Sequence, residues 1–373
     1  MNSVPQNAAT ARPQELFTAI SEVDGSHGRL IYRGYTIEDL AGSITFEEAA
    51  HLLWFGKLPN RIELRQLTEH LAAERTLPQY IEDIIRSFPV SARPIDVLAA
   101  AVAGLAKSTE KPTADDAVAI TAKIPVMAAL FANIRENRVM PAPRPEFSHI
   151  ANYLYLLNGF PAEDAVQQAV TAYSVLLADH GMNASTFTAR IIASTGADMA
   201  SAVSGAIHAL KGPLHGGAPS LTLEMLQAIQ SPENAEAWIE NELAAGKRIM
   251  GIGHRVYKTF DPRAEILRKM AKLAADPDFF LLAETVEQTA LRKLHERENL
   301  QRLWTNVEFY SAVVLNAAGI QPDLMTPTFA IARTLGYTAH VLEQTQKTNL
   351  IRPESMYTGP QGRQFISLDQ RQG

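Results

Sequence analysis

Three histidines of this chain stand directly beside glycines, in Asp179-His180-Gly181, Leu214-His215-Gly216-Gly217 and Gly253-His254-Arg255. An imidazole changes its charge near neutral pH and suits proton transfer, and a neighbouring glycine lets a ligand approach closely. Charged groups follow in Asp261-Pro262-Arg263 and Asn306-Val307-Glu308-Phe309-Tyr310. One such histidine alone is most often an ordinary loop residue. Three of them, with a carboxylate and arginines, predict acid–base chemistry on a small anionic substrate.

Other common kinds of site do not fit the sequence. Gly251-Ile252-Gly253-His254-Arg255-Val256 begins like a dinucleotide fingerprint, but Val256 stands where the third small residue belongs and no βαβ unit surrounds it. The histidines lack a ligand spacing such as His-Glu-x-x-His, so we expect no metal. A serine hydrolase would need a Gly-x-Ser-x-Gly elbow, which is missing. The absence of cysteine excludes thiolate nucleophiles and disulfides.

The composition is that of a globular protein. Of 373 residues, 46% are hydrophobic and 20% are charged, and the length favours two domains. The net charge of -6 argues against general nucleic-acid binding, although a local basic cluster can still hold a phosphorylated cofactor. Residues 1–13 lack the pattern of a secretory signal, and the most apolar stretch, 97–106, is about half the length of a membrane span. We expect a cytoplasmic protein with no membrane contact and a loose N-terminus.

The hydrophobic periodicity predicts an all-α fold with only short strands, such as residues 30–32. One predicted helix is opened by Pro161 and leads to His180; its buried stripe comprises Val166, Val170, Tyr173 and Leu177. A second begins at Asp261-Pro262, with a buried stripe of Ile266, Leu267, Met270 and Leu273. No fixed-period repeat or sustained heptad is present, which argues against solenoids and coiled coils.

Several long motifs, in the same order, resemble those of the citrate synthases. They are Gly-Pro-Leu-His-Gly-Gly-Ala at 212–218, Gly-Ile-Gly-His-Arg-Val-Tyr-Lys at 251–258, Asp-Pro-Arg-Ala at 261–264, Asn-Val-Glu-Phe-Tyr-Ser at 306–311, Thr-Pro-Thr-Phe-Ala-Ile-Ala-Arg at 326–333 and Arg-Pro-Glu-Ser-Met-Tyr-Thr-Gly at 352–359. The resemblance begins near Ser26-His27-Gly28-Arg29-Leu30 and covers almost the entire chain. It is closest to the short, dimeric bacterial class.

The resemblance implies a helical homodimer with two domains in each subunit. The large domain would comprise residues 1–215 and 326–373, and an inserted small domain, 216–325, would close over the substrate. The family joins acetyl-CoA to oxaloacetate and hydrolyses citryl-CoA to citrate and CoA. The implied enzyme is an acyltransferase of the tricarboxylic acid cycle, with an acyl-CoA co-substrate and no tightly bound cofactor.

The resemblance also implies roles for individual residues. Glu308 resembles the base that removes a methyl proton, while His215 resembles the neutral histidine that donates a hydrogen bond to the thioester oxygen. His254 resembles the histidine that binds the oxaloacetate ketone and supplies a proton. Removal of the proton alone is insufficient, because the developing enolate oxygen must be stabilised at the same time.

Further positions match the family's binding residues. Those for oxaloacetate are His180, Arg263, Arg333 and Arg352, with Arg352 reaching the site of the neighbouring subunit. Planar, permanently charged guanidinium groups suit the two carboxylates of oxaloacetate. Those for CoA are Met250, Gly251, Ile252 and Gly253 along the adenine, and Arg255 and Lys258 near the phosphates.

Glu308 departs from the family pattern, which has aspartate in this place. Glutamate has similar acidity but one more methylene, so the chemistry is allowed while reach and approach angle change. Ala312, where the family commonly has glycine, could take part in a packing change that accommodates the longer Glu308 side chain.

Two alternatives to citrate synthase stay open. One is 2-methylcitrate synthase using propionyl-CoA, since one methyl group changes discrimination by only about 1–3 kcal/mol. The other is a non-catalytic dimer that binds CoA or a dicarboxylate.

Overall fold

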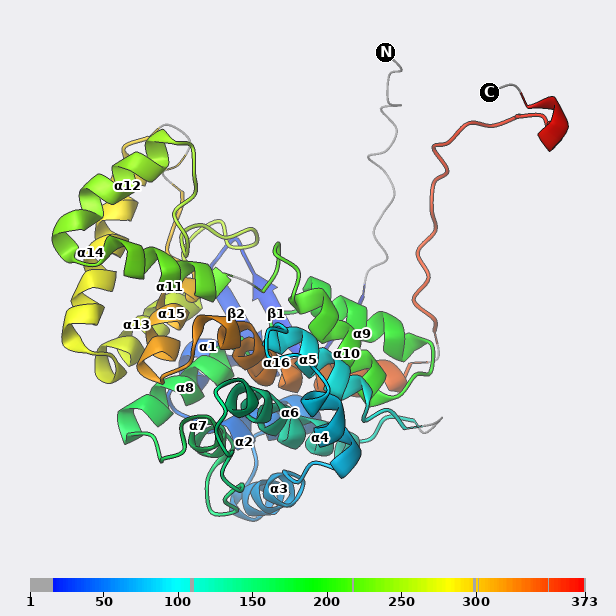
Figure 1. Cartoon of the computed structure of the whole chain (residues 1–373), viewed down its shortest axis with the longest axis horizontal. Coiled ribbons are helices and arrows are strands. Elements are labelled where there is room, and N and C mark those ends of the chain that lie inside the picture. Colours follow the sequence, from blue (N-terminus) through cyan, green and yellow to red (C-terminus); the bar gives the residue numbers. More distant parts are fainter. Residues whose placement is uncertain are drawn as a thin grey trace.

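The computed structural model describes residues 16–107, 111–216, 218–297, 300, 302–347 and 349–371. The predicted loose segment 1–13 and Gly217 lie outside these residues. The described chain is mainly helical (Figure 1), which confirms the all-α prediction. The helices are α1 Ile37–Leu40, α2 Phe46–Phe55, α3 Arg61–Ala73, α4 Gln79–Arg86, α5 Pro94–Ala103, α6 Ala114–Arg135, α7 His149–Asn158, α8 Asp164–Leu177, α9 Ala184–Ser194, α10 Met199–Leu210, α11 Ala218–Ile229, α12 Ala235–Ala244, α13 Pro262–Ala274, α14 Pro277–His295, α15 Val307–Ala317 and α16 Pro322–Thr345, with short 3-10 helices at Pro232–Asn234 and Leu368–Gln370.

The strands form one small antiparallel sheet in the order β1-β2-β3. β1 spans Ser21–Asp24, β2 Arg29–Tyr32 and β3 Tyr35–Thr36. Ser21 pairs with Tyr32 in the first ladder, and Tyr32 pairs with Tyr35 in the second. The predicted strand at residues 30–32 therefore lies in β2. This sheet is too small to form a layer of the core, and it serves instead to hold loops of the site described below.

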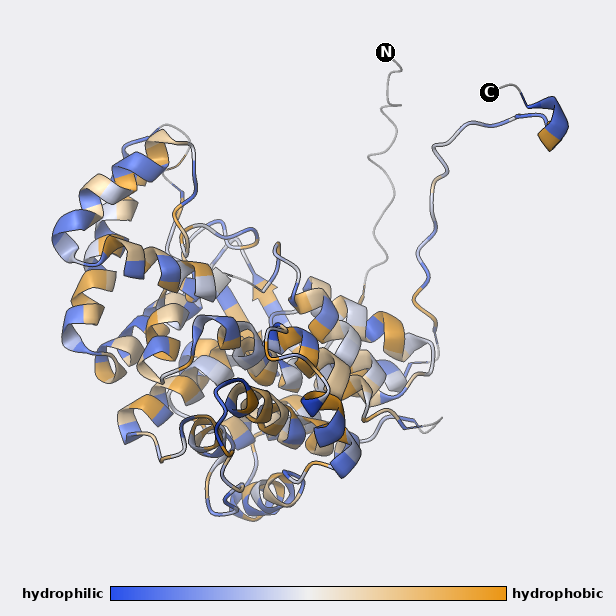
Figure 2. Ribbon diagram, viewed as in Figure 1, coloured by the Kyte–Doolittle hydropathy of each residue, from blue (hydrophilic) through white to orange (hydrophobic). Residues whose placement is uncertain are grey.

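Helix α16 lies at the centre of the molecule and packs against α2, α5, α6, α8, α9, α10, α11 and α15 (Figure 1). Most of its residues are buried, because helices cover it on several sides. Outer helices such as α3 and α12 instead carry hydrophilic and hydrophobic residues on different sides (Figure 2). This arrangement puts Arg333, which lies within α16, in the interior.

The longest apolar helix lies outside residues 97–106, the stretch that the sequence analysis singled out as most apolar. Among the described residues, α6 is long and apolar enough to cross a membrane by length and composition, and 89% of its most apolar window is buried inside the protein. A helix that is hydrophobic all round belongs either in a membrane or in the core of a large protein. The burial by neighbouring helices identifies α6 as a core helix.

The two helices predicted to lead into the site differ in detail from the expectation. Helix α8 begins at Asp164 and not at Pro161, because Glu163 still has extended backbone and forms the N-cap. Helix α13 begins at Pro262 as predicted, and the Asp261 side chain caps it. Its predicted stripe is partly wrong, since Leu267 is buried but Leu273 is 61% exposed. The buried face of α13 instead contains Pro262, Arg263, Ala264, Leu267 and Ala271.

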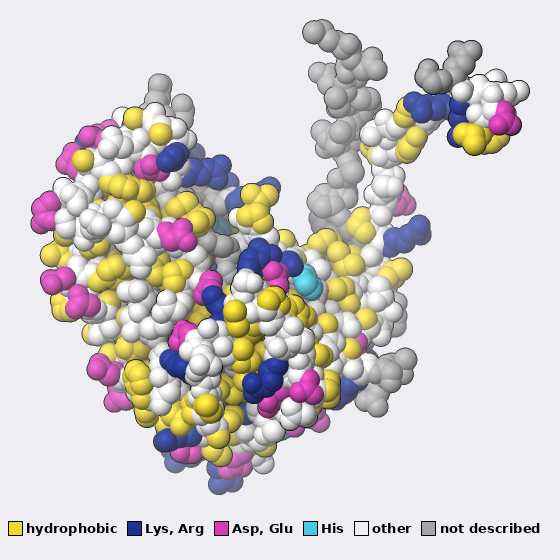
Figure 3. Space-filling view, in the orientation of Figure 1, with side chains coloured by type: hydrophobic (Ala, Val, Ile, Leu, Met, Phe, Trp, Pro, Cys, Tyr) yellow, Lys and Arg dark blue, Asp and Glu magenta, His cyan; other side chains and the backbone are white. Residues whose placement is uncertain are grey.

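The C-terminal segment after α16 runs away from the helical body and ends near the 3-10 helix at Leu368–Gln370 (Figure 1). At the opposite end of the molecule, α12 and α14 project beyond the central helices. Lys and Arg side chains lie along the boundary between this projecting end and the remaining helices (Figure 3).

Candidate active site

The loop that carries His254 is paired with the segment that enters α15. An isolated antiparallel bridge joins Ile252 to Thr305, and backbone hydrogen bonds of 2.7 and 2.9 Å connect residues 251–253 with 304–306. The pairing requires glycine at Gly251, which has φ of 75° and whose added Cβ would lie 2.8 Å from Phe309. The loop that carries His254 and the start of α15 are therefore held together by backbone hydrogen bonds.

Asn306 and Asp261 fix the first turn of α15. The Asn306 side chain caps this helix by accepting from the Glu308 amide at 2.9 Å, and it donates to the Gly253 carbonyl at 2.7 Å. The Asp261 carboxylate accepts from the Val307 amide at 3.0 Å. The backbone at Glu308 and directly before it is thus held from two directions.

Asp261 also holds Arg263 in place at the start of α13. The guanidinium Nε and Nη2 donate to the two carboxylate oxygens of Asp261 at 2.9 and 2.8 Å. Both side chains are buried, at 4% and 1% exposure. Within the described residues Nη1 of Arg263 makes no hydrogen bond, which leaves one donor edge for an anionic ligand.

The hairpin of β1 and β2 supports two of the histidine loops. The Tyr32 hydroxyl donates to the Asp179 carbonyl at 2.7 Å, next to His180. The Lys258 amide donates to the Gly25 carbonyl at 2.8 Å, next to the His254 loop. The hairpin therefore ties together two loops that lie far apart in the sequence.

His180, His254 and Tyr257 form a cluster of rings. His180 Nε2 and the Tyr257 hydroxyl are 3.1 Å apart, and the ring centres of His180 and His254 are 5.6 Å apart. Arg263 lies over the Tyr257 ring at 5.6 Å. The structure thus brings two predicted histidines and a predicted arginine together.

Arg333 enters the same region from α16. Its Nε donates to the Leu177 carbonyl at 2.6 Å, at the end of α8, and its guanidinium lies 4.9 Å from the centre of the Phe329 ring. The positive charge of Arg333 contributes to the pKa shifts of His180 and Glu308, so both are within its electrostatic reach.

His254 has a defined tautomer. Its Nδ1 accepts hydrogen bonds of 3.0 Å from the amides of both Val256 and Tyr257. A neutral imidazole that accepts at one nitrogen carries its proton on the other. Nε2 of His254 is therefore the donor available to a ligand.

His215 is held through Ser185. The Ser185 hydroxyl lies 2.8 Å from His215 Nε2 and also receives a hydrogen bond of 2.8 Å from the Tyr337 hydroxyl. The single Ser185 proton can go to Asn183 Oδ1, at 2.7 Å, or to His215. When Ser185 donates to His215 Nε2, the imidazole keeps its proton on Nδ1 and can donate it to a ligand.

The environment keeps these histidines neutral. Burial, together with Arg333, lowers the pKa of His215 to about 4. Burial, together with Arg263, lowers the pKa of His254 to about 4. Burial and the same two arginines hold the pKa of His180 well below its usual value. At neutral pH, all of them are hydrogen-bond donors without a charge.

The pKa of Glu308 is shifted upward, whereas the pKa values of the three histidines are shifted downward. The residue is partly buried, and its Oε2 atom has less than 1 Å² of exposed surface and no hydrogen-bond partner among the described residues. Burial raises the pKa of Glu308 to about 7, although Arg263 and Arg333 oppose the shift. A carboxylate with a pKa near the working pH is suited to act as a general base.

A cavity of about 710 Å³ adjoins the His254 loop. Of the predicted CoA residues, Ile252, Gly253 and Arg255 line it. Met250, Gly251 and Lys258 are not among its lining residues, and the Lys258 ammonium donates to the Arg255 carbonyl at 2.9 Å. The remaining lining residues are Leu243, Gly246, Lys247, Arg248, Ile249, His254, Leu294, Leu300 and Leu303.

The sequence analysis did not single out Lys247 and Arg248, which add two positive charges to this cavity. Their signal in the sequence is a basic pair directly before residues 249–253. Ser185 and Tyr337 were also missed, because only the folded chain brings them to His215.

Arg352 is not brought to this site within the single chain. It is exposed and belongs to the C-terminal segment that follows α16. The remaining predicted oxaloacetate and catalytic residues lie on the elements described above, so Arg352 is the exception.

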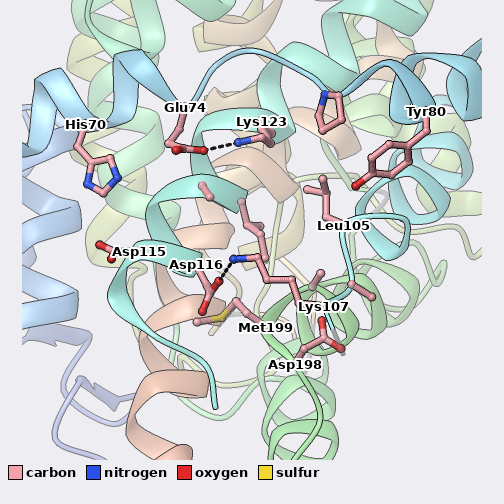
Figure 4. A pocket seen from close by; sticks show the side chains of 15 residues that line it. His70, Glu74, Tyr80, Leu105, Lys107, Asp115, Asp116, Lys123, Asp198 and Met199 are labelled. Atoms are coloured by element: carbon pink, nitrogen blue, oxygen red, sulfur yellow. Dashed lines mark hydrogen bonds and ion pairs between the residues drawn. The ribbon is translucent and has the colours of Figure 1, made fainter. Parts of the chain in front are cut away.

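A second cavity, of about 450 Å³, contains none of the predicted residues. In this cavity Glu74 is paired with Lys123 at 2.5 Å and Asp116 with Lys107 at 2.7 Å (Figure 4). Its central charges are therefore paired with one another. Across the described parts of the chain, no group of three or more metal-ligand side chains is placed to hold an ion.

Comparison with known proteins identifies the family. Residues 14–354 match the model of the citrate synthase C-terminal domain. The chain is 39% identical to citrate synthase 2 of Bacillus subtilis over 92% of this chain and 93% of the relative. The chain belongs to the citrate synthase family.

Solved citrate synthases share this fold. The Thermotoga maritima enzyme has a TM-score of 0.86 and 34% identity, with coverage of 98% of this chain and 99% of the other. The Thermoplasma acidophilum citrate synthase, in complex with carboxymethyl coenzyme A and oxaloacetate, has a TM-score of 0.88 and 29% identity, with coverage of 96% and 97%. The family also includes 2-methylcitrate synthase 2 of Corynebacterium glutamicum, 35% identical over 95% of each chain.

Proposed function

We propose that this enzyme condenses acetyl-CoA with oxaloacetate and hydrolyses the resulting citryl-CoA to citrate and CoA. The observation that carries the proposal is the carboxylate of Glu308, whose pKa burial raises to about 7 against the opposing charges of Arg263 and Arg333, on a helix start that is hydrogen-bonded to the His254 loop. A base and uncharged donors are the groups that enolisation of a thioester requires. The names of the relatives support the same reaction.

Oxaloacetate would bind first, between α13 and α16. Arg263 and Arg333 supply guanidinium donors for its carboxylates, and His180 adds a neutral donor. Arg352 of a second subunit would complete the clamp in a homodimer. Bidentate arginine contacts suit this ligand, because they fix its orientation as well as its charge.

Enolisation of the acetyl group would follow. Glu308 removes a proton from the methyl carbon, while His215 Nδ1–H donates a hydrogen bond to the thioester oxygen. The low pKa of His215 keeps this imidazole neutral, so that it stabilises the enolate by hydrogen bonding.

Carbon–carbon bond formation would use His254. Its Nε2–H binds the ketone oxygen of oxaloacetate and supplies a proton as the enolate carbon attacks the carbonyl carbon. Water then attacks the thioester carbon of citryl-CoA and the CoA thiolate leaves. The proton on Glu308 and the two protons of the attacking water then restore the imidazole and the CoA thiol, and the third is released to solvent as the new citrate carboxylate forms.

The cavity beside residues 249–255 would hold CoA. Its apolar lining suits the adenine and pantetheine, and Lys247, Arg248 and Arg255 suit the phosphates. The sequence favoured Lys258 over Arg255 for the phosphates, whereas we favour Arg255, because it lines this cavity and the Lys258 ammonium donates to a backbone carbonyl.

Domain organisation and assembly are part of the proposal. Residues 216–325 would form the small domain, which closes over substrate on the large domain of residues 1–215 and 326–373. Two chains would form the active homodimer, in which each subunit lends Arg352 to the other. A cytoplasmic location remains a prediction from the sequence.

A second candidate is 2-methylcitrate synthesis from propionyl-CoA. The similarity to 2-methylcitrate synthase 2 favours it. The two reactions differ by one methyl group in the acyl pocket.

Release of the CoA thiol tests both candidates. Purified protein is mixed with oxaloacetate and either acetyl-CoA or propionyl-CoA, and the thiol is measured with a colorimetric reagent. The protein contains no cysteine, so the signal arises from CoA alone. A higher initial rate with acetyl-CoA supports citrate synthase, and a higher rate with propionyl-CoA supports 2-methylcitrate synthase. Binding of both ligands without thiol release would instead support a non-catalytic dimer.

A further inference from the structure

Among the buried polar atoms near the active site that lack hydrogen-bond partners in the described residues, two lie on helices that pack against each other. They are Oε2 of Glu308, on α15, and the hydroxyl of Tyr173, on α8, and each has less than 1 Å² of exposed surface. A phenol can donate a hydrogen bond, whereas an ionised carboxylate only accepts. Buried polar groups normally find a partner, so these two are complementary to each other.

The fold places these atoms in the same region. Helices α8 and α15 pack against each other. After burial, the carboxylate of Glu308 is the strongest cause that raises the pKa of Tyr173. The hydroxyl of another buried tyrosine, Tyr153 on α7, does have a hydrogen-bond partner, because it lies 2.8 Å from the hydroxyl of Thr328.

We propose that Tyr173 positions the catalytic base by donating a hydrogen bond to the Glu308 carboxylate when the enzyme closes around its substrates. The inference rests on the proposed function, in which Glu308 is the base, and on the proposed domains. Tyr173 lies in the large domain and Glu308 in the small domain, so closure moves α15 relative to α8. The extra methylene of glutamate, compared with aspartate, gives the carboxylate the reach toward Tyr173.

The other charged groups around Glu308 are engaged elsewhere, because in the proposed function the remaining guanidinium N–H groups of Arg263 and Arg333 bind the oxaloacetate carboxylates. Arg263 and Asp261, at the start of α13, are bound to each other through two hydrogen bonds. Arg333, on α16, donates its Nε to a backbone carbonyl. On the remaining helices packed against α15, Glu287 of α14 binds the Tyr310 hydroxyl, and the titratable residue of α11, Glu224, is exposed.

The hydrogen bond would act on both geometry and proton affinity. With one oxygen held by Tyr173, the other oxygen is directed at the acyl group. A hydrogen bond to the ionised form also favours ionisation of Glu308. Loss of the hydroxyl should therefore slow proton removal and shift the acidic limb of the pH profile upward.

The test is Tyr173→Phe in the full-length enzyme, measured by thiol release between pH 5.5 and 9. We expect kcat to fall about tenfold and the acidic limb to move up by about one pH unit, with an unchanged KM for oxaloacetate. Thermal stability should stay the same or rise, because the hydroxyl that is removed has no partner in the structure.

Tyr153→Phe is the matched control. It also removes a buried tyrosine hydroxyl, but one that is hydrogen-bonded to Thr328. We expect this variant to lose stability while its kcat and pH profile stay those of the original enzyme. The contrast separates a general effect of a buried Tyr→Phe change from an effect on the base.

A double-mutant cycle with Glu308→Asp tests the pairing itself. The shorter aspartate should not reach Tyr173, so Tyr173→Phe should change kcat by less than twofold in that background. The inference is overturned if Tyr173→Phe leaves kcat and the pH profile unchanged, or if its effect is the same in both backgrounds. Failure of the proposed function is a separate result, in which the original enzyme itself releases no thiol.

Discussion

The Asp261 carboxylate accepts a hydrogen bond of 3.0 Å from the Val307 amide, the residue directly before Glu308. The same carboxylate is paired with Arg263 through both of its oxygens. One buried side chain therefore joins the starts of α13 and α15, and fixes Arg263, the proposed oxaloacetate ligand, relative to Glu308, the proposed base.

Replacement of Asp261 by Asn should strongly destabilise the enzyme. The change leaves the buried guanidinium of Arg263 without its counter-charge, and breaking a buried ion pair typically costs about 3–5 kcal/mol. The free energy of unfolding, measured with denaturant, should fall by this amount. Glu265→Gln is the matched control on α13, since Glu265 makes only ion pairs of 3.6 and 3.8 Å at 58% exposure, and should change stability by less than about 0.5 kcal/mol. Equal effects of the two changes would contradict the role given to Asp261.

Glu308→Gln should nearly abolish turnover and leave oxaloacetate binding almost intact. The amide keeps the shape of the side chain but cannot take a proton, and loss of a general base typically costs about 100- to 10,000-fold in rate. Steady-state kcat and calorimetric titration with oxaloacetate measure the two effects separately. Glu308→Asp is the control, because it restores a base with the shorter reach and should retain activity. Near-normal turnover by Glu308→Gln would remove Glu308 from the mechanism.

The raised pKa of Glu308 also predicts a pH dependence of stability. Folding raises this pKa from its usual 4.5 to about 7, so the folded state favours the protonated carboxyl. The resulting stabilisation is fully present below pH 4.5 and is lost as pH rises through 7, with a total of at most about 3 kcal/mol. Unfolding free energies of the original enzyme and of Glu308→Gln should therefore diverge between pH 5 and 8.5, with the original enzyme losing more. A constant difference across this range would show that Glu308 has an ordinary pKa in the folded protein.

The site was partly predictable because its motifs carry their own local geometry. Gly251 and Asn306 set the loop and the cap that hold His254 and Glu308, and both lie within the motifs. Contacts between distant segments were not predictable, as with Ser185 and Tyr337 beside His215. The fold class followed from helical periodicity, whereas the exposure of Leu273 depends on which neighbours pack against α13.

The last prediction concerns Arg352, which the single chain leaves exposed and outside the site. If Arg352 completes the site of a second subunit, Arg352→Ala and Glu308→Gln should each be inactive as homodimers. Subunit exchange between the two variants should restore activity, because one site of a mixed dimer combines an intact Glu308 with an intact Arg352 from its neighbour. The other site then carries both defects, so the mixed dimer should reach about half the activity of the original enzyme per dimer.

Differently tagged chains allow the mixed dimer to be isolated by two affinity steps before thiol release is measured. The matched control is a mixed dimer of the double variant, Arg352→Ala with Glu308→Gln, and the original chain. In a shared-site enzyme this control has one defect in each site and should be inactive. If Arg352 instead acts within its own chain, the two outcomes are reversed: the control keeps one intact site, and the mixed dimer of single variants has none.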